Sequence, residues 1–513
     1  MGLVLKNVNI TGGKLSSTIP QPTDEPWIRN PDWLPLDDVQ PGDNKFSGLW
    51  AVYEDIPSTH WFYYQIGGGN VSEVDYGDGT TQTASNLVFY SKFYDYSSLP
   101  GPVLVDEDWG NYKMVVINIQ FATTTTGILC DRQSTFGYAS KPTGWLDVVM
   151  DCSTMSTLNI SSQRLSIFIE RLRILNNNLT NPNSIFQRLL RLRIFDWDID
   201  GVNVGNFQST FQTSRGDFRT SNNEPISLIN NTTTQFASTF ASSHNLKKIG
   251  TISSTSADSL SSTLASCVNL EEVDKVIVPN VTNSSSTFNN CPKLKSINEI
   301  DISATQNTTA LFQACNSLEK IGETNTLNIN SATTAANMFL DARTLKKISI
   351  LGSNLGNVTS MFSRCYEIEE INFINQPTNI TAMTSMFSEC FSLKKIDLSS
   401  SIITGLANST FVNCILIEEI SLGDCSGITN TSSMFAGCTM LRRLRVPNIK
   451  ISFIITSTAI EAPEMVTVFN DLADLITLGL PAANINISNT PASSNLTPAE
   501  RDIALNKGWT ITG

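Results

Sequence analysis

Apolar residues recur along much of the chain with two alternating spacings. In residues 385–400, SMFSECFSLKKIDLSS, they first stand three apart, at Phe387, Cys390, Leu393 and Ile396. That spacing suits a helical turn, whereas the following KIDLS alternates charged and apolar residues with the period of a strand. The segment therefore predicts a turn or short helix, then a short strand, then a loop rich in serine, threonine and asparagine.

The same pattern occurs nine times, and its anchor positions are separated by 24, 24, 24, 27, 23, 25, 24 and 24 residues. A unit this short buries too little apolar surface to fold alone, so we expect the copies to stack into a solenoid. The anchor is phenylalanine in all copies except one, and the anchors are Phe240, Leu264, Phe288, Phe312, Phe339, Phe362, Phe387, Phe411 and Phe435.

A cysteine follows the anchor by three residues in seven copies, and Ser243 and Ala342 take its place in the other two. The position therefore requires a small buried residue, and a free cysteine behaves as a small hydrophobe. Metal or redox chemistry is disfavoured because the chain has no CxxC pair. We expect reduced, buried thiols at Cys267, Cys291, Cys315, Cys365, Cys390, Cys414 and Cys438.

The repeated text MFxxCxxLxxIdLs resembles the BspA-type leucine-rich repeats over residues 230–450. This type of repeat is common in bacterial surface proteins and occurs in some bacteriophage virion proteins. Residues 126–229 fit the spacing less well, and Phe186 and Phe211 there predict degenerate first turns that cap the stack. The resemblance implies a leucine-rich-repeat solenoid that displays or binds.

Residues 451–513 resemble the terminal cap that follows such repeats. Within them, NLTPAERDIALNKGWTIT has a complete helix signature, with Thr497 as N-cap, Pro498 at the first helical position and Glu500 closing a capping box. Gly508 follows the end of the predicted helix, and the WTIT segment then predicts a short strand that pairs with the last turn. We therefore expect a small α/β cap at the carboxyl-terminal end.

Residues 46–125 are rich in aromatic and β-branched residues and predict an all-β region. They resemble the polycystic-kidney-disease-type (PKD-like) immunoglobulin-like domain, an adhesion or spacer module. The matching residues are Asp75, Gly77, Asp78, Gly79 and Thr80 in the GDG turn, Tyr96, and the strand 112–119. The full prediction is a mixed fold, in which a PKD-like β-sandwich precedes the solenoid and its cap.

Residues 1–45 are predicted to form an amino-terminal arm, within which residues 20–44 are rich in proline and aspartate, and the prolines disfavour a central strand or a helix interior. An extended linker explains this composition. A docking arm explains it as well, because Trp27, Trp33 and Leu36 are apolar anchors that a free linker does not need. We expect this arm to be poorly ordered alone and to attach the protein to a larger assembly.

One short motif suggests a calcium site. Asp196, Asp198 and Asp200, followed by Gly201, match the first half of a calcium-binding loop. Phe207 stands where such a loop requires a bidentate glutamate, and a solvated strand face explains the three carboxylates equally well. We therefore predict no cofactor and no catalytic residue, and the calcium site remains only a candidate.

The net charge and the amino-terminal sequence narrow the range of functions that we expect. The 34 basic and 47 acidic residues give a net charge of −13, which disfavours nucleic acid and anionic membranes as partners. The first residues lack the pattern of a secretory signal, and unpaired thiols are compatible with a reducing compartment. We therefore expect a non-enzymatic bacteriophage virion protein, assembled in the host cytoplasm with other virion proteins. It would be a head fibre, tail fibre or decoration protein.

The alternative is a BspA-like adhesin on a bacterial cell surface that binds host protein or polysaccharide. In either case the solenoid surface would bind without covalent chemistry. Strands stacked about 4.8 Å apart would align one outward charged residue per copy into a row of alternating sign. An ordinary solvated face explains this row as well, so we assign none of its members as ligands. They are Lys247, Glu271, Lys295, Glu319, Lys346, Glu369, Lys394, Glu418 and Arg442.

Overall fold

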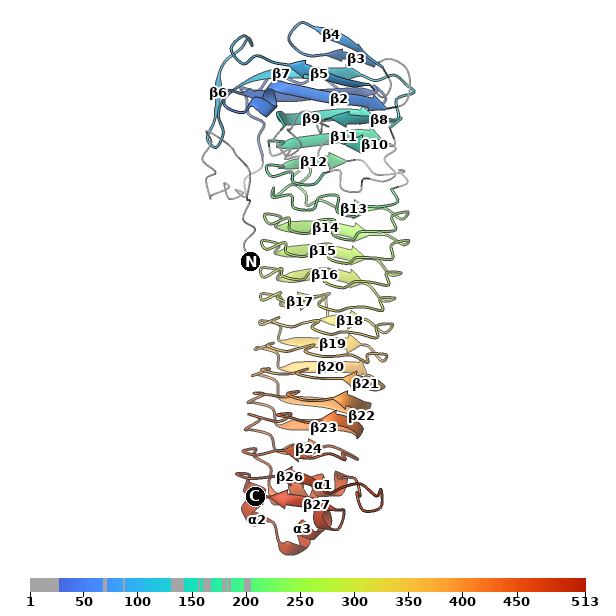
Figure 1. Ribbon diagram of the computed structural model, residues 1–513, viewed down its shortest axis with the longest axis vertical. Coiled ribbons are helices and arrows are strands. Elements are labelled where there is room, and N and C mark those ends of the chain that lie inside the picture. The colour runs from blue at the N-terminus through green and yellow to red at the C-terminus, as the bar shows by residue number, and fades with distance from the viewer. Residues whose placement is uncertain are drawn as a thin grey trace. The chain divides into compact units, whose positions relative to one another are not determined.

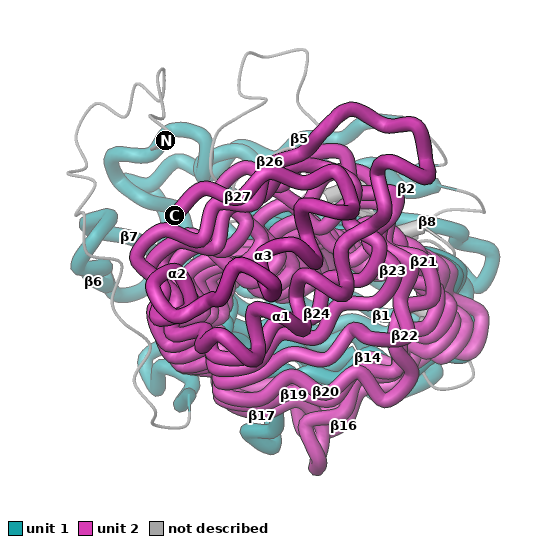
Figure 2. Tube along the Cα trace, turned by 90° about the horizontal axis from the view of Figure 1, so that it is seen from below, with its two compact units in different colours: residues 1–250 teal, residues 251–513 magenta. Residues whose placement is uncertain are grey.

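The protein is described here from a computed structural model. Its chain divides into two compact units, unit 1 with residues 1–250 and unit 2 with residues 251–513 (Figure 2). The fold is mostly β, with few helices and with a β-solenoid. The structure describes residues 27–513 except 68–71, 86–87, 131–142, 156, 160–167, 178–181, 183–185 and 198–203.

Most of the described strands of unit 1 belong to two β-sheets, and Figure 1 labels most of these strands. The larger has the order β12-β11-β9-β1-β7-β3-β4, with β6 beside β7, and the smaller has the order β10-β8-β2-β5. The strands of the larger sheet are β1 (Lys45–Tyr53), β3 (Ser72–Asp75), β4 (Thr81–Ala84), β6 (Leu104–Asp106), β7 (Gly110–Gln120), β9 (Trp145–Cys152), β11 (Arg171–Asn177) and β12 (Ile194–Trp197). The smaller sheet contains β2 (Trp61–Gly67), β5 (Phe89–Phe93), β8 (Gly127–Cys130) and β10 (Thr157–Asn159).

Aromatic side chains from the two sheets form the core between them. Trp50 of β1 contacts Phe62 of β2 with ring centroids 5.5 Å apart, and Trp145 of β9 contacts both rings. A side chain at Gly48 would collide with the ring of Trp145, which explains why β1 carries a glycine there. The strands predicted within residues 46–125 therefore form and pack as two layers.

Two details refine the prediction for this region. Asp75 and Asp78 accept hydrogen bonds from the backbone N–H groups of Gly77 and Thr80, as expected for a turn capped by aspartates. The buried tyrosine after this turn is Tyr94, whose hydroxyl donates to the Tyr76 carbonyl, and it lies two residues before the predicted Tyr96.

The predicted boundary after residue 125 does not separate two sheets. β9, at residues 145–152, pairs antiparallel with β1 and parallel with β11, so one continuous sheet joins the amino-terminal strands to the first parallel turns. The hydrogen-bonded edge of β1 that an isolated sandwich would expose is therefore covered by β9. A separate PKD-like sandwich thus remains a prediction from sequence.

Unit 2 consists of parallel strands, one or two per turn of the chain. In sequence order they form the runs β15-β16-β17, β18-β19-β20 and β21-β22-β23-β24. Their bounds are β15 (Glu272–Ile277), β16 (Ser296–Asp301), β17 (Lys320–Ile321), β18 (Thr326–Asn328), β19 (Lys347–Leu351), β20 (Glu370–Asn375), β21 (Asn379–Ala382), β22 (Lys395–Leu406), β23 (Glu419–Asn430) and β24 (Arg443–Arg445). Unit 1 also contains β13 (Leu228–Ile229), and β14 (Lys248–Ser253) lies where the two units meet in sequence.

The segment around each anchor phenylalanine is a series of tight turns. The sequence predicts either a turn or a short helix here, and the structure has the turn. Around Phe387, Ser385 and Glu389 both have positive φ angles, of 54° and 62°. The left-handed conformation interrupts an α-helix. The Phe387 N–H donates to the carbonyl of Thr410 in the next turn, and the Cys390 N–H donates back to the Phe387 carbonyl. Backbone hydrogen bonds thus join successive turns on this side as well.

The anchors and cysteines form two internal ladders. Consecutive phenylalanine rings in unit 2, from Phe288 to Phe435, stack with centroids 5.3 to 5.9 Å apart. Each thiol from Cys291 onward donates to the carbonyl of the anchor residue in the preceding turn. These Sγ to O distances, 3.0 to 3.2 Å, involve Cys291, Cys315, Cys365, Cys390, Cys414 and Cys438.

The thiol therefore does more than fill space, because it gives a buried carbonyl an additional donor, although Ala342 occupies the same position without one. In unit 1 the hydroxyl of Ser243 makes the equivalent bond to the carbonyl of Phe211. Burial raises the pKa of the thiols, to about 12 for Cys291 and Cys438. All seven ladder cysteines are reduced and buried, as predicted, and so is Cys425 of β23.

Asparagines form a third ladder, at the polar corner of each turn. Asn283, Asn307 and Asn357 each accept, through the side-chain oxygen, the backbone N–H two residues ahead, and Asn430 does the same. In each case the acceptor begins an Asn-x-Ser/Thr triplet. These triplets are therefore explained by turn formation.

Residues beyond the last repeat turn form the predicted α/β cap. It contains α1 (Ala462–Asp471), α2 (Pro491–Asn495) and α3 (Pro498–Leu505) with the parallel strands β25 (Phe453–Ile454), β26 (Ala483–Asn486) and β27 (Trp509–Thr512). The capping box between Thr497 and Glu500 is present, and the WTIT strand pairs with β26. Within the described residues, no helix combines the length and the apolar character needed to cross a bilayer.

Candidate functional site

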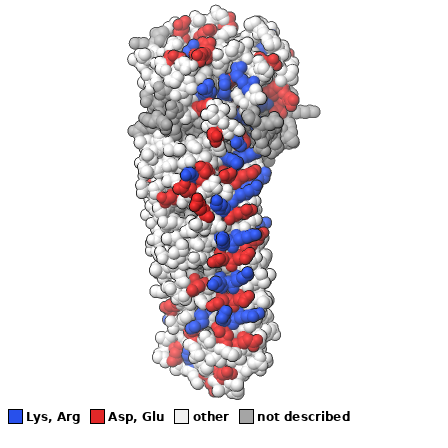
Figure 3. Space-filling view, turned by 180° about the vertical axis from the view of Figure 1, so that it is seen from behind, with Lys and Arg blue, Asp and Glu red and all other residues white. Residues whose placement is uncertain are grey.

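The outward face of the strands in unit 2 carries two adjacent rows of charged side chains, which we call the charged face. Figure 3 shows basic and acidic side chains alternating from turn to turn. Strand register aligns the second row, since Lys347 lies opposite Glu370, and Lys395 opposite Glu419. The first row comprises the predicted residues of unit 2, Glu271, Lys295, Glu319, Lys346, Glu369, Lys394, Glu418 and Arg442.

Ion pairs along the charged face are long and exposed. Lys295 and Glu271 lie 3.7 Å apart, and Lys394 and Glu369 lie 3.8 Å apart, with all four side chains at least 41% exposed. Each exposed pair contributes only a few tenths of a kcal/mol. A charged partner can therefore replace these contacts at little cost to the fold.

A groove of about 640 Å³ opens on the charged face where the repeat spacing is longest. The spacing from Phe312 to Phe339 is 27 residues, and here β17 ends after two residues and β18 begins a separate sheet. The extra residues turn away from the strand direction at Gly322, which has a φ of 64°. The lining residues are Glu319, Asn325, Thr344, Lys346, Lys347, Glu367, Glu369 and Glu370.

The groove presents four carboxylates, two ammonium groups, an amide and a hydroxyl. These groups suit a polar, extended ligand that offers both donors and acceptors, such as a glycan or a hydrophilic peptide. Among the described residues, no set of three histidine, cysteine, aspartate or glutamate side chains is arranged to hold a metal ion.

The calcium candidate is only partly described. Asp196 lies in β12, where its carboxylate is 3.3 Å from the Arg173 guanidinium and accepts the backbone N–H of Ser221. Asp198 and Asp200 lie outside the described residues. Because protein groups already engage Asp196, its carboxylate has a structural role, and the calcium site remains a prediction.

The two histidines that could suggest catalysis have packing roles in the structure. His60 Nε2 lies 2.7 Å from the Tyr53 carbonyl oxygen, and its ring contacts Phe93. His244 is half-buried, and burial together with Arg215 lowers its pKa.

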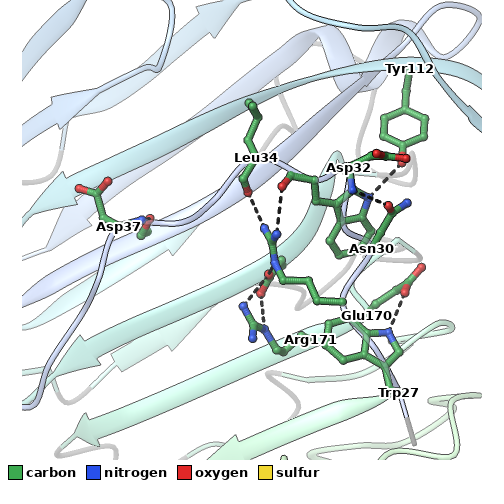
Figure 4. Close-up of polar contacts among 12 residues, drawn as sticks. Trp27, Asn30, Asp32, Leu34, Asp37, Tyr112, Glu170 and Arg171 are labelled. Atoms are coloured by element: carbon green, nitrogen blue, oxygen red, sulfur yellow. Dashed lines mark hydrogen bonds and ion pairs between the residues drawn. The ribbon is translucent and has the colours of Figure 1, made fainter. Parts of the chain in front are cut away.

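The predicted docking residues pack against the core of unit 1, and Figure 4 shows Trp27 beside Glu170. Trp33 is buried in the core cluster and donates its Nε1–H to the Tyr112 hydroxyl. Trp27 and Leu36 pack against the same cluster, and Trp27 donates to the Glu170 carboxylate at 3.0 Å. This corrects the expectation that residues 27–45 lack a core, because unit 1 supplies one. Docking to another protein through these three side chains would require them to leave the core of unit 1.

An ion cluster that sequence reasoning missed fixes this arm. Asp147 of β9 is fully buried and accepts hydrogen bonds of 2.7 Å from both Arg29 of the arm and Arg171 of β11. Arg29 also donates to the Trp33 carbonyl. The only signal in the sequence is a single aspartate in an apolar strand, WLDVVM, because a buried carboxylate needs cationic partners.

Comparisons with known proteins agree with the repeat geometry. Residues 356–462 match the family described as BspA type leucine rich repeat region, in six copies, and residues 258–376 match the family described as Mycoplasma protein of unknown function, DUF285. Comparison with curated proteins gives no match. Residues 356–462 of unit 2 are thus similar to BspA-type leucine-rich repeats.

Solved structures that resemble the chain are also leucine-rich-repeat proteins. One from Bacteroides ovatus has 13% identity and a TM-score of 0.30, over 75% of this chain and 94% of its own. One from Eubacterium ventriosum has 12% identity and a TM-score of 0.31, over 64% and 86%. A leucine rich cell surface protein from Faecalibacterium prausnitzii has 17% identity and a TM-score of 0.22, over 50% and 86%.

Proposed function

We propose that this protein is a non-enzymatic attachment protein whose charged face binds a polar surface polymer, and that it serves as a structural protein of a bacteriophage virion. The groove between Glu319 and Glu370 carries the proposal. It is a recess on the regular charged face, and it arises from the single longest repeat spacing. A solenoid that only decorates a particle needs no such break in its repeat spacing.

The repeat architecture supports binding in a second way. The thiol, asparagine and phenylalanine ladders supply the internal contacts of the turns. Residues of the charged face can therefore vary without loss of the fold. Glycans or proteins of a host cell surface are the proposed partners of this face, and other virion proteins are the proposed partners during assembly.

The buried, unpaired thiols support assembly in the reducing host cytoplasm. Mass spectrometry of purified particles tests the virion role, because a structural protein remains in particles after gradient purification and high-salt washing. Its absence from the particles would contradict that role and leave the alternative, a BspA-like bacterial surface adhesin, which the repeat match also supports.

Charge reversal tests the groove. The full chain, displayed in many copies on beads to gain avidity, should adhere to host envelopes. The double variant K346E/K347E should lose about tenfold or more of that adhesion. The matched variant R442E/R443E makes the same change of charge on the same face, where Arg443 pairs with Glu419 and not with a lining residue, and it should lose less. No adhesion by the wild type, or equal loss in both variants, would contradict the groove as the binding site.

A further inference from the structure

β5 lies at the edge of a sheet and carries exposed aromatic side chains, a combination that sheet edges normally avoid. Among the described strands it ends the order β10-β8-β2-β5, and its side chains Phe89 and Phe93 are 53% and 49% exposed. Ser91 between them is exposed as well. The ring of Trp61 on β2 lies beside Phe93, with centroids 4.8 Å apart. An uncovered apolar edge strand is a template for pairing with another strand.

The usual protection of such an edge is missing from β5. Its one charged residue, Lys92, does not guard the edge, because it forms an ion pair of 2.6 Å with Asp78 and lies over the ring of Tyr76. The strand at the end of the larger sheet, β4, instead exposes Thr81 and polar neighbours. Among the described residues, the edge of β5 is therefore apolar on its outward face and has no strand paired with its backbone.

Strand register shows which backbone groups face this edge. The Tyr94 N–H donates to the His60 carbonyl, and β5 runs antiparallel to β2 with Lys92 opposite Phe62. Hydrogen-bonded pairs alternate along an antiparallel ladder, so Tyr90 and Lys92 direct their N–H and C=O groups toward β2. Phe89, Ser91 and Phe93 consequently direct theirs away from β2.

We propose that β5 pairs antiparallel with β5 of a second copy of this chain, with Ser91 opposite Ser91. This register places Phe89 of each copy opposite Phe93 of the other, so that the exposed rings cover one another. In this register Phe89, Ser91 and Phe93, whose backbone N–H and C=O groups point away from β2, form the hydrogen-bonded pairs between the two copies. Both copies use the same strand, so the interface has two-fold symmetry and closes at the dimer.

A second copy fits this edge better than an unrelated strand. The segment FYSKF is aromatic at both ends and has a small residue at its centre, so it matches itself when reversed. On the other face Tyr90 would stand opposite Lys92, an aromatic residue beside a cation. No like charges meet in this register.

A cysteine at the symmetry axis tests the register directly. Hydrogen-bonded antiparallel partners have Cα atoms about 5.5 Å apart, which lies within the range that a disulfide spans. The variant Ser91→Cys in the full chain should form a disulfide-linked dimer on mild oxidation. Phe89→Cys alone should not, since it faces Phe93, whereas F89C/F93C should. The wild type under the same oxidation controls for the native cysteines.

Sedimentation of the full chain tests the association itself. An interface this small is weak, so the dimer should form at protein concentrations up to about 100 µM. Ser91→Pro removes an N–H that points away from β2 and should leave the monomer folded, as its far-ultraviolet circular dichroism would show. Both Ser91→Pro and Phe93→Lys should weaken dimerisation about tenfold or more.

Val105→Lys, at an exposed valine of β6, is the matched control and should leave the dimer intact. A wild type that stays monomeric throughout this range overturns the proposal, even if a different protein later covers β5. So does a dimer that withstands Ser91→Pro, or a Ser91→Cys variant that forms no link.

Discussion

Unit 1 and unit 2 use charge in opposite ways. In unit 1 a fully buried carboxylate, Asp147, holds two arginines from distant parts of the chain. In unit 2 most charged residues lie in exposed rows, and the recurring polar contacts come from buried thiols and hydroxyls and from asparagines at the polar corners of the turns. Unit 1 therefore depends on a few irreplaceable residues, whereas unit 2 distributes its stability over many similar ones.

The largest expected difference concerns thiol reactivity. With the pKa of a ladder thiol raised to about 12, the thiolate is roughly 1000-fold scarcer at neutral pH than for a free cysteine. A thiol reagent should therefore leave the ladder cysteines of the native protein almost unmodified and should titrate most of the ten cysteines after denaturation. Disulfides among the ladder cysteines would contradict the comparison.

Removal of one anchor ring should destabilise unit 2 strongly. Phe387 is fully buried between the rings of Phe362 and Phe411, so Phe387→Ala should cost about 4 kcal/mol of unfolding free energy. Phe387→Leu should cost less, because Leu264 fills the same position in another turn. Denaturant unfolding monitored by circular dichroism measures both, and equal losses would show that ring stacking contributes little.

The ion cluster should dominate the stability of unit 1. Asp147→Ala leaves Arg29 and Arg171 facing an apolar core without their partner, and should cost about 3 kcal/mol. Intrinsic tryptophan fluorescence during denaturation measures this loss of stability, because Trp27 and Trp33 lie in the arm that Arg29 anchors. Asp37→Asn, which breaks only the exposed pair with Lys45, is the control and should cost less than about 0.5 kcal/mol.

The smallest effect should come from the charged face. Lys394→Ala removes an exposed ion pair with Glu369 and should change the unfolding free energy by less than about 0.5 kcal/mol. A larger loss by the same denaturant measurement would mean that the charged face serves the fold, and would weaken the argument that its residues are available for binding.

How far sequence predicts structure also differs between the two units. In unit 2 the repeat spacing identifies the core, because Phe387 and Cys390 recur in equivalent positions, and the capping box at Thr497 depends on residues three apart. The left-handed turns are harder to predict, since Arg364 and Glu389 adopt positive φ angles that their residue types disfavour. The groove has a visible cause in the longest spacing, but the spacing alone does not tell which side chains line it.

The amino-terminal part of unit 1, before Phe186, offers no such repetition. The bond from Arg29 to Asp147 joins residues 118 positions apart, and no local pattern connects them. Continuity of the sheet across residue 125 depends on β9 pairing with β1, a contact that the alternation of either strand allows but does not require. Long-range pairings of this kind hold the arm on unit 1 and join the sheet across residue 125, and neither follows from a local pattern in the sequence.

Hydrogen exchange of the full chain, with and without host envelope material, tests the central claim most directly. If the charged face binds, amides of β17, β19 and β20 beside the groove should gain protection, while those of the cap strands β26 and β27 should not change. Protection confined to unit 1, or none at saturating envelope, would contradict a binding role for the solenoid.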